Sequence, residues 1–259
     1  MEALPELPEV ETVVRALAPR LEGRRIVDAS FPGPRVLRSS IPKLKGLRIQ
    51  SIRRHGKLLM FNCGSGILGI HLGMTGKLLI NSAPGPYTRA FFKLNGLTLS
   101  FDDVRQFGSV RWLDRPPEHL GPDPLEITVE EFTERLKRRK GSIKPLLLDQ
   151  KFLRGVGNIY ADESLFRARI HPRTIAGRIG EARAQALHAA IVEVLLEAIE
   201  RHGSSVSDYA DPDGREGSFQ NFHRVYQRTG LPCLTCSTPI RRIVMGQRGT
   251  HYCPRCQKT

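Results

Sequence analysis

The segment PELPEVE, residues 5–11, places a proline directly before a glutamate near the start of the chain. A proline with a free amino terminus would be a secondary amine, which gives a permanently cationic iminium after attack on a sugar carbon. A free α-amine has a reference pKa of about 8, so roughly a tenth of it is neutral at pH 7, against under about a thousandth of a lysine side chain. The pair therefore predicts a nucleophile at Pro5 and a general acid at Glu6.

Met1 to Leu4 precede the proline in the sequence as written, so the Pro5 nitrogen belongs to a tertiary amide. The lone pair of such a nitrogen is delocalised into the carbonyl and cannot attack a sugar. We expect catalysis if Pro5 becomes terminal, for example through initiation at a TTG or CTG codon for Leu4 followed by methionine removal. Alternatively, the segment only opens a helix, with Pro8 at the first position and the acidic residues Glu9 and Glu11 near its positive end.

The chain ends in two CxxC pairs with residues 237–252 between them. Two such pairs can offer four thiolates to one tetrahedral metal ion, and this spacing is typical of structural zinc sites. A redox dithiol is the alternative, but two spaced pairs in a short polar tail suit a metal better. The sequence therefore predicts one structural Zn²⁺ held by Cys233, Cys236, Cys253 and Cys256, while Cys63 in an apolar run is expected to be a buried thiol.

The composition favours a polyanionic partner. The 259 residues suit two domains, 40% of them are hydrophobic, and the formal net charge is +14. A basic surface attracts nucleic acid, and each phosphate contact steepens the salt dependence of binding. No signal-like start and no apolar run long enough to span a bilayer is present, so we expect a cytoplasmic monomer without a membrane partner.

Apolar alternation predicts short strands in the first half of the chain. Asn95-Gly96 predicts a type I′ hairpin turn, and the residues 63–66 mark another reversal. A β-sandwich or barrel is therefore expected. The predicted strands are Arg25 to Phe31, Leu47 to Arg53, Lys57 to Asn62, Ile67 to Leu72, Ala90 to Leu94, Leu97 to Phe101 and Ser109 to Leu113.

After the proline-rich stretch 115–126 the pattern becomes helical. Thr128 and Glu131 predict a capping box for a helix with a basic far end at 135–140. A second helix is predicted from an apolar face that ends near Gly203 and comprises Leu187, Ile191, Val194, Leu195, Ala198 and Ile199. Between them Gly155 and Gly157 lead into a helix that we expect Asn158 to cap, where backbone amides could approach phosphate.

PELPEVE, the segment DQKFLRGVGNIYADE at 149–163 and the cysteine tail together resemble the formamidopyrimidine-DNA glycosylase family of bacterial base-excision repair enzymes. The resemblance implies an α+β fold: an N-terminal β-sandwich with a leading helix, then a helical helix-two-turn-helix domain that ends in a zinc-finger β-hairpin. The implied ranges are 1–114 for the catalytic sandwich, 115–127 for a linker, 128–229 for the helical domain and 230–259 for the zinc finger.

The resemblance also implies roles for individual residues, in a reaction where a damaged base is flipped from the duplex. Pro5 and Glu6 match the catalytic pair, Lys57 in HGKLLMF matches a lysine that contacts phosphate and assists elimination, and Arg248 in QRGTHYC matches an arginine that grips phosphates. Met74, Arg105 and Phe107 match the residues that fill the void left by the base. Taken alone, each of these residues could also be a core or surface side chain.

Further DNA contacts are implied at Tyr87, Arg139 and Asn158. Tyr87 stands where the family often has a histidine, and it could still donate a hydrogen bond. Arg138 and Lys140 are near-equivalent candidates to Arg139. Gln106 occupies a position where a second arginine can occur, so one phosphate contact of the family is expected to be missing.

PELPE, rather than the PEGPE of the sister endonuclease VIII group, indicates oxidised purines in double-stranded DNA as substrate: 8-oxoguanine and formamidopyrimidines. The stretch at 213–233 also resembles the loop that covers an oxidised purine, although it could be an ordinary mobile loop. The expected activity is a glycosylase that also nicks the strand by β- and δ-elimination. The alternatives are an oxidised-pyrimidine preference, a lesion-binding protein with a blocked Pro5, or an enzyme in which the Lys57 amine replaces that of Pro5.

Overall fold

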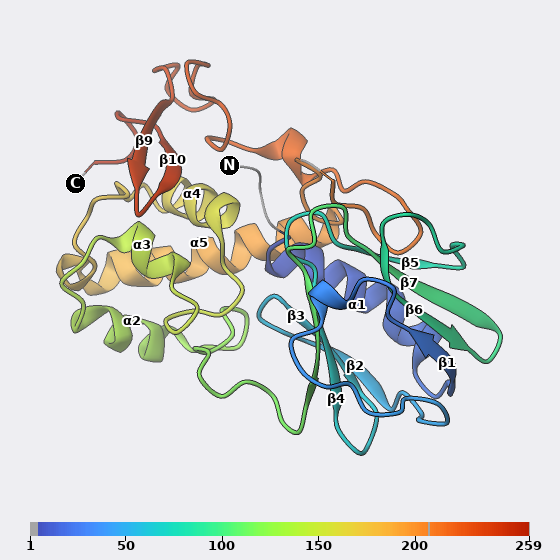
Figure 1. Ribbon diagram of the computed structural model, residues 1–259. Helices are drawn as coiled ribbons and strands as arrows, with labels where there is room; N and C mark the ends of the chain where they lie inside the picture. Colours follow the sequence, from blue (N-terminus) through green and yellow to red (C-terminus); the bar gives the residue numbers. More distant parts are fainter. Residues whose placement is uncertain (1–4, 207, 259) are drawn as a thin grey trace. The chain divides into compact units, whose positions relative to one another are not determined.

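The computed structural model describes residues 5–206 and 208–258, which form two compact units. The first, here called the sandwich unit, comprises residues 5–118 together with 201–220. The second, the helical unit, comprises residues 119–200 and 221–258. Figure 1 labels the strands β1 to β7 in the former and the helices α2 to α5 with the hairpin β9–β10 in the latter. Across the described residues, no helix combines the length and apolarity that crossing a membrane requires.

The sandwich unit begins with helix α1, Leu7–Leu21. Glu6 is its N-cap and forms a reciprocal capping box with Glu9, and Pro8 lies in the first turn, where its missing N–H costs no hydrogen bond. The apolar residues recur every three or four positions, so one face of the helix is buried. That face comprises Val10, Val13, Val14, Leu17 and Leu21, which join the core of the sheets.

Two antiparallel four-stranded sheets follow, with strand orders β1-β6-β7-β5 and β2-β3-β4-β8. Apolar residues of both sheets meet α1 in one hydrophobic cluster, which confirms the predicted sandwich. A short 3₁₀ helix, Pro34–Val36, lies after the first strand. The strands are β1 Ile26–Ser30, β2 Ser51–His55, β3 Leu58–Asn62, β4 Ile67–His71, β5 Lys77–Ile80, β6 Thr88–Leu94, β7 Leu97–Asp102 and β8 Ser109–Leu113.

The predicted strands differ from the structure in several details. Strand β5 was not predicted, because it has only four residues and directly follows a glycine-rich turn. The strand expected at Leu47 begins at Ser51, since residues 47–49 are bonded irregularly to Arg24 and Ile26. Asn95-Gly96 does join β6 and β7, but only Gly96 has a positive φ, so the turn is not type I′. The Asn95 side chain is instead tied to the backbone N–H of Arg25 at 2.8 Å.

The helical unit contains α2 Val129–Lys137, α3 Ile143–Leu148, α4 Asn158–Arg167 and α5 Glu181–Glu200, with a 3₁₀ turn at Ala176–Arg178. Thr128 caps α2 by accepting from the backbone N–H of Glu131 at 3.2 Å. Helix α2 ends at Lys137, so Arg138 to Lys140 lie beyond it. The predicted apolar face of α5 is buried along its whole length. The chain then passes a 3₁₀ turn, Phe219–Phe222, and ends with β9 Arg241–Met245 and β10 Arg248–Tyr252.

Residues 201–220 pack with the sandwich unit, whereas the predicted helical range of 128–229 includes them. The bidentate ion pair of Arg20 with Asp213, at 2.6 and 2.9 Å, holds this returning segment. A hydrogen bond from the Ile80 N–H to the Pro212 carbonyl, at 3.0 Å, extends the contact to β5. The compact units therefore do not follow the predicted ranges at residues 201–220. Long-range contacts, and not order along the chain, place this segment with the sandwich unit.

Candidate functional site

Pro5 and Glu6 lie immediately before α1, and both are buried. Glu6 is 2% exposed, and its backbone N–H donates to the Glu9 Oε2 at 2.8 Å. As the N-cap residue, Glu6 has extended backbone dihedrals, so its side chain is turned back onto the first turn of the helix. The capping box thus fixes the candidate general acid next to the candidate nucleophile.

Glu9 supports this segment through two hydrogen bonds of its carboxylate, a role that was not predicted from the sequence. Its Oε1 accepts from the Ser204 N–H at 2.7 Å, while its Oε2 accepts from Glu6. Gly203 has a φ of +81°, and a Cβ there would lie 2.8 Å from the Glu9 Oε1. The Tyr209 hydroxyl donates to the Glu9 carbonyl at 3.3 Å, and burial, then the Glu9 charge, raises the Tyr209 pKa. The three-residue spacing of Glu6 and Glu9 was the available signal.

Lys57 lies in the turn between β2 and β3, and the strand that was predicted to begin at Lys57 begins at Leu58. Its positive charge acts on His71, the last residue of β4. Burial, and then the positive charges of Lys57 and Arg111, lower the His71 pKa to about 4. The neutral His71 ring accepts from the Gly73 N–H at 3.0 Å through Nδ1. Lys57 and the turn that carries Met74 therefore share one neighbour.

Met74 and Phe107 lie on two loops that touch each other. Met74 is half-buried in a turn, and Phe107 is 54% exposed on the loop between β7 and β8. Gly73 permits the contact, because a Cβ at this position would clash with the Gly108 nitrogen. The Arg105 guanidinium lies 4.9 Å from the centre of the Phe107 ring. An exposed aromatic ring beneath a cation is a surface that can stack against bases.

Asp103 fastens both loops, and no sequence pattern pointed to it. The side chain is fully buried; Oδ1 accepts from the Thr75 hydroxyl at 2.5 Å and Oδ2 accepts from the Gly108 N–H at 2.8 Å. Its backbone N–H donates to the carbonyl of Tyr87 at 2.9 Å. Tyr87 itself is 51% exposed, so its ring is available at the same edge of the sandwich.

In the helical unit, Asn158 is the first residue of α4, and the N-cap is Gly157 instead of the predicted Asn158. The Asn158 side chain donates through Nδ2 to the carbonyl of Gly249 at 3.0 Å, so it bonds the zinc hairpin rather than its own helix. Gly249 directly follows Arg248, the first residue of β10. The structure thus brings together Asn158 and Arg248, which lie far apart in the sequence.

A buried ion pair supports the same carbonyl. The Lys144 ammonium, 0% exposed, lies 2.5 Å from the Asp162 Oδ1 and donates to the Gly249 carbonyl at 3.1 Å. Asp162 Oδ2 accepts from the backbone N–H of His251 at 2.9 Å and lies 3.2 Å from the His251 Nδ1. Helices α3 and α4 therefore hold β10 at one carbonyl, that of Gly249, and at one amide, that of His251. No motif or spacing in the sequence had pointed to Lys144 or Asp162.

Arg139 is exposed just beyond α2. Its guanidinium carbon lies 5.7 Å from the centre of the Phe152 ring, and its carbonyl accepts from the Gly177 N–H at 2.9 Å. Arg138 is exposed too, but its side chain lies 3.6 Å from a Glu134 carboxylate oxygen. Arg138 is therefore paired with an acidic residue, whereas the Arg139 guanidinium lies near an aromatic ring.

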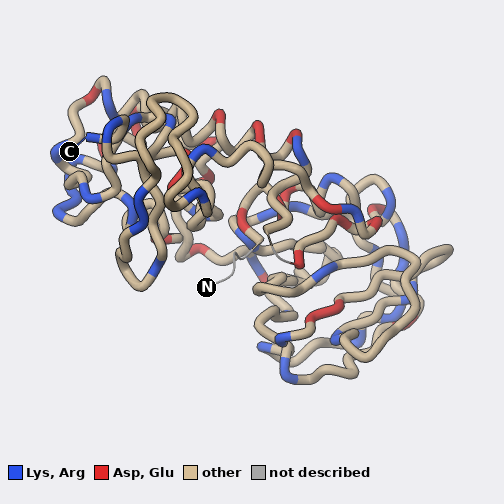
Figure 2. Tube along the Cα trace, turned by 90° about the horizontal axis from the view of Figure 1, so that it is seen from above, with Lys and Arg blue, Asp and Glu red and all other residues tan. Residues whose placement is uncertain are grey.

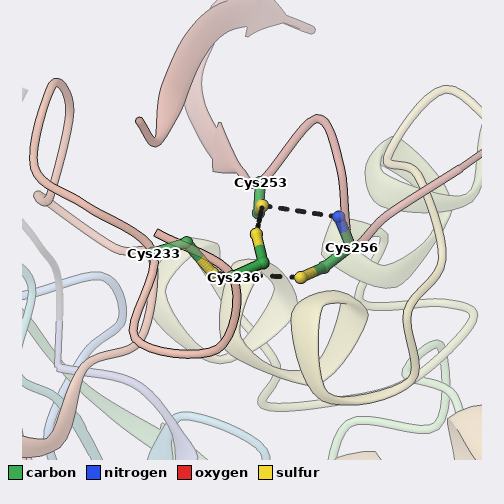
Figure 3. A group of neighbouring side chains, drawn as sticks. All are labelled: Cys233, Cys236, Cys253 and Cys256. Atoms are coloured by element: carbon green, nitrogen blue, oxygen red, sulfur yellow. Dashed lines mark hydrogen bonds between the residues drawn. The ribbon is translucent and has the colours of Figure 1, made fainter. Parts of the chain in front are cut away.

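The four predicted ligands converge, as Figure 3 shows. The Sγ atoms of Cys233, Cys236, Cys253 and Cys256 all lie within 4.8 Å of one another. Tetrahedral zinc with Zn–S bonds of about 2.3 Å requires sulfurs about 3.8 Å apart. The Cys233–Cys256 and Cys236–Cys253 sulfurs are 3.9 and 3.4 Å apart, too far for disulfide bonds. The cysteines fit one structural zinc ion.

Cys63 is buried as predicted, within the apolar core of the sandwich unit. Burial raises its pKa to about 11, which keeps the thiol protonated and unreactive. The structure therefore separates the five cysteines into one apolar side chain and one metal site.

Three family models match the chain: the formamidopyrimidine-DNA glycosylase N-terminal domain at residues 4–110, its H2TH domain at 120–210, and a zinc finger found in FPG and IleRS at 230–259. The formamidopyrimidine-DNA glycosylase of Solibacter usitatus is 56% identical over 98% of this chain and 100% of its own length. That of Symbiobacterium thermophilum is 44% identical over 98% of this chain and 89% of its own.

Solved structures agree with this match. The MutM (FPG) protein of Thermus thermophilus superposes with a TM-score of 0.89, at 43% identity over 98% of both chains. The Lactococcus lactis FPG in complex with a Fapy-dG containing DNA superposes with a TM-score of 0.89, at 35% identity over 98% of this chain and 100% of its own. With the sandwich, the helical unit and the four-cysteine hairpin all accounted for, the chain belongs to the formamidopyrimidine-DNA glycosylase family.

Proposed function

We propose that this member of the family is a bifunctional DNA glycosylase of base-excision repair that removes oxidised purines from duplex DNA and then nicks the strand. The observation that carries the proposal is the Pro5-Glu6 pair, held at the start of α1 by the buried Glu9. The relatives are named formamidopyrimidine-DNA glycosylases, and related structures contain Fapy-dG, abasic-site or carbocyclic 8-oxo-G DNA.

In the proposed reaction the free amine of Pro5 attacks C1′ of the damaged nucleotide. The glycosidic bond breaks, and its electron pair leaves with the base. The amine then loses its proton and its lone pair opens the C1′–O4′ bond, so that the ring oxygen takes up a proton and an iminium forms; Glu6 handles these protons. The resulting iminium is an electron sink, so loss of a proton from C2′ expels the 3′ phosphate and a further elimination expels the 5′ phosphate. Water then hydrolyses the imine, which regenerates the amine and releases the unsaturated sugar fragment as an aldehyde, so the products are the free base, this fragment and a gapped strand.

The remaining residues are proposed to hold the DNA. Lys57, Arg139, Asn158 and Arg248 would contact phosphates, and the hydrogen bonds to the Gly249 carbonyl fix the hairpin beside Arg248. Met74, Arg105 and Phe107 would enter the duplex where the base leaves, and Tyr87 would add a contact at the same edge. Such wedges offset the cost of unstacking by filling the void.

We propose 8-oxoguanine and formamidopyrimidines as the substrates, since the relatives share this name and Leu7 stands where the endonuclease VIII group has glycine. Leu7 is fully buried at the start of α1, so the side chain is part of the frame around Pro5 and Glu6. A DNA repair enzyme of this kind would act at the nucleoid in the cytoplasm.

The proposal requires Pro5 to be terminal, and residues 1–4 lie outside the described part of the chain. The match to the N-terminal family model begins at residue 4, where an initiator methionine would precede Pro5. Borohydride reduces an iminium to a stable amine, so it traps the enzyme on DNA. The decisive experiment is trapping on an 8-oxoguanine duplex with protein expressed from its native start region, followed by peptide mapping.

A cross-link on a terminal Pro5 is the expected result, and it would establish both the start and the imine mechanism. A cross-link on Lys57 would transfer the nucleophile's role to that amine. Damage-selective binding without any cross-link, with Leu4 still attached, would contradict the enzyme and leave a lesion-binding protein. Protein made to begin at Pro5 is the matched control, because it separates a blocked amine from a defective site.

A further inference from the structure

The helical unit has a basic hollow at the end of the zinc hairpin remote from Arg248. The hollow has a volume of about 540 Å³, and four cations, Thr235 and two of the zinc ligands line it. One of the cations is the second residue after α4, one lies in the first turn of α5, and two lie in the tail after β10. We call these cations, Arg169, Arg183, Arg255 and Lys258, the knuckle cations. In Figure 2 blue segments gather around the C-terminal end of the chain.

The knuckle cations have no acidic partner among the residues that the structure describes. All four are exposed, and none of them forms an ion pair or a side-chain hydrogen bond within those residues. Arg167, two residues before Arg169, gives the contrast: it lies 2.7 Å from Glu197 and 3.6 Å from Glu193. Acidic residues of α5 thus neutralise the neighbouring arginine, whereas neither of these two lines the hollow.

The zinc site explains only part of this charge. Four thiolates around one Zn²⁺ carry a net charge of about −2. Cys236 and Cys256, the two half-buried ligands, line the hollow, while Cys233 and Cys253 are buried. Four cations exceed that negative charge, so the hollow stays positive after the zinc–thiolate group is counted. A positive, open surface attracts anions.

We propose that the knuckle cations bind phosphates of a nucleic-acid backbone, as a contact separate from the catalytic machinery. This rests on the proposed function only in that the chain works on DNA. Arg248 and the hollow are separated by the length of β10, about 16 Å at about 3.3 Å per residue. Duplex DNA carries one negative charge per about 1.7 Å of its axis, so a polymer can satisfy both places.

The form of the hollow favours a polymer over a free phosphate ion. Its cations sit on separate elements and carry long, flexible side chains. A single phosphate needs donors that converge at one point, commonly with backbone amides, whereas a backbone needs only several charges along its path. Binding should therefore depend on counterion release and weaken steeply as salt rises.

The test is the salt dependence of binding to an undamaged duplex of about three helical turns. Arg183→Gln/Arg255→Gln removes two knuckle cations and keeps most of the length of both side chains. Lys43→Gln/Lys45→Gln removes two exposed lysines from the sandwich unit and is the matched control. We expect the slope of log K against log salt to become shallower by about 0.9 for each lost phosphate contact in the first variant, and to stay unchanged in the control. Equal slopes in both variants would overturn the proposal.

Two further measurements distinguish backbone binding from charge balance at the zinc site and from a small-anion site. Zinc content must stay at one ion per chain in the Arg183→Gln/Arg255→Gln variant; loss of zinc would mean that the cations only balance the thiolates. In a titration with inorganic phosphate, the unchanged protein and the variant should behave alike. If only the unchanged protein binds phosphate, and the salt slope for DNA is the same in both, the hollow is a small-anion site and the proposal is wrong. Nicking of a short lesion duplex should persist in the variant, so failure of the proposed enzyme function would appear there and not in the slope.

Discussion

Glu6 serves two purposes at the start of α1, because the residue that caps the helix is also the candidate general acid. Capping holds its backbone, and the buried Glu9 holds that backbone in turn. A side chain fixed in this way loses little conformational entropy when the substrate arrives, which is the physical advantage of building a proton donor into a helix end.

We expect Glu6→Gln to slow excision of an intact damaged base by about 10²- to 10⁴-fold, the range for loss of general acid–base catalysis, with little change in DNA affinity. Single-turnover excision and equilibrium binding on the same 8-oxoguanine duplex would measure the two effects. Glu11→Gln, on the same helix and paired with Arg15 and Arg54, is the control. Equal losses of excision and affinity would contradict a proton-transfer role.

The buried Lys144–Asp162 pair makes a different prediction, about stability. Lys144→Met leaves a carboxylate buried without its cation and should cost about 3–5 kcal/mol of unfolding free energy. Lys144→Met/Asp162→Leu removes both charges and should recover part of that loss, because the His251 N–H then lacks its acceptor. Urea unfolding of the zinc-loaded proteins would measure both variants. A double variant no more stable than the single one would mean that the pair is not the source of the loss.

At the scale of elements, the two loops that carry Met74 and Phe107 depend on one buried carboxylate. Asp103→Ala leaves the Thr75 hydroxyl and the Gly108 N–H without their acceptor, at a cost of about 1–3 kcal/mol for each group. The loops should then lose their fixed position, and the preference for damaged over undamaged duplex should fall. The ratio of the two dissociation constants is the measurement.

Asp102→Asn is the matched control for Asp103→Ala, because Asp102 is the adjacent residue and accepts from the Thr88 hydroxyl at 2.7 Å instead. Its preference for damaged DNA should stay close to that of the unchanged protein. If Asp103→Ala keeps the same preference, the loops do not need this carboxylate.

The end of β4 should make stability sensitive to acid. His71 has a folded-state pKa of about 4 against an ordinary value of 6.5. Between these two pH values the unfolded chain binds a proton at His71, whereas the folded protein does not. Stability should therefore be complete above about pH 6.5 and fall toward pH 4, by at most about 1.4 kcal/mol per pH unit. His71→Asn keeps a hydrogen-bond acceptor for Gly73 and should flatten this dependence in urea unfolding measured across that pH range. An unchanged slope would assign the effect to other groups.

At the scale of the whole molecule, the zinc ion is expected to hold the hairpin that carries Arg248. Cys253→Ser should release zinc and abolish duplex binding, since metal binding supplies folding free energy to such a site. Zinc content and affinity for a damaged duplex are the measurements. Cys63→Ala, a change at the buried cysteine of the sandwich unit, should keep zinc. Wild-type affinity in zinc-free Cys253→Ser would remove the structural role of the ion.

The sequence by itself determined the features that short-range patterns encode. Two CxxC pairs specify a metal site, period-two alternation specifies most strands, and Pro8 with Glu9 specifies the start of α1. PELPEVE and the segment at 149–163 indicated the family for the same reason: residues a few positions apart define the motif. The hairpin at Asn95-Gly96 was also local, although its turn type was wrong and its asparagine bonds the distant Arg25.

Only the tertiary structure decided which distant residues meet. Glu9 bonds Ser204, Asp103 joins Thr75 to Gly108, and Lys144 with Asn158 supports the Gly249 carbonyl. No periodicity records such contacts, because a buried charge or amide is stabilised by whatever partner the fold brings to it, regardless of separation along the chain. The sequence therefore determined the chemical groups of the candidate site, and long-range burial decided how those groups are held.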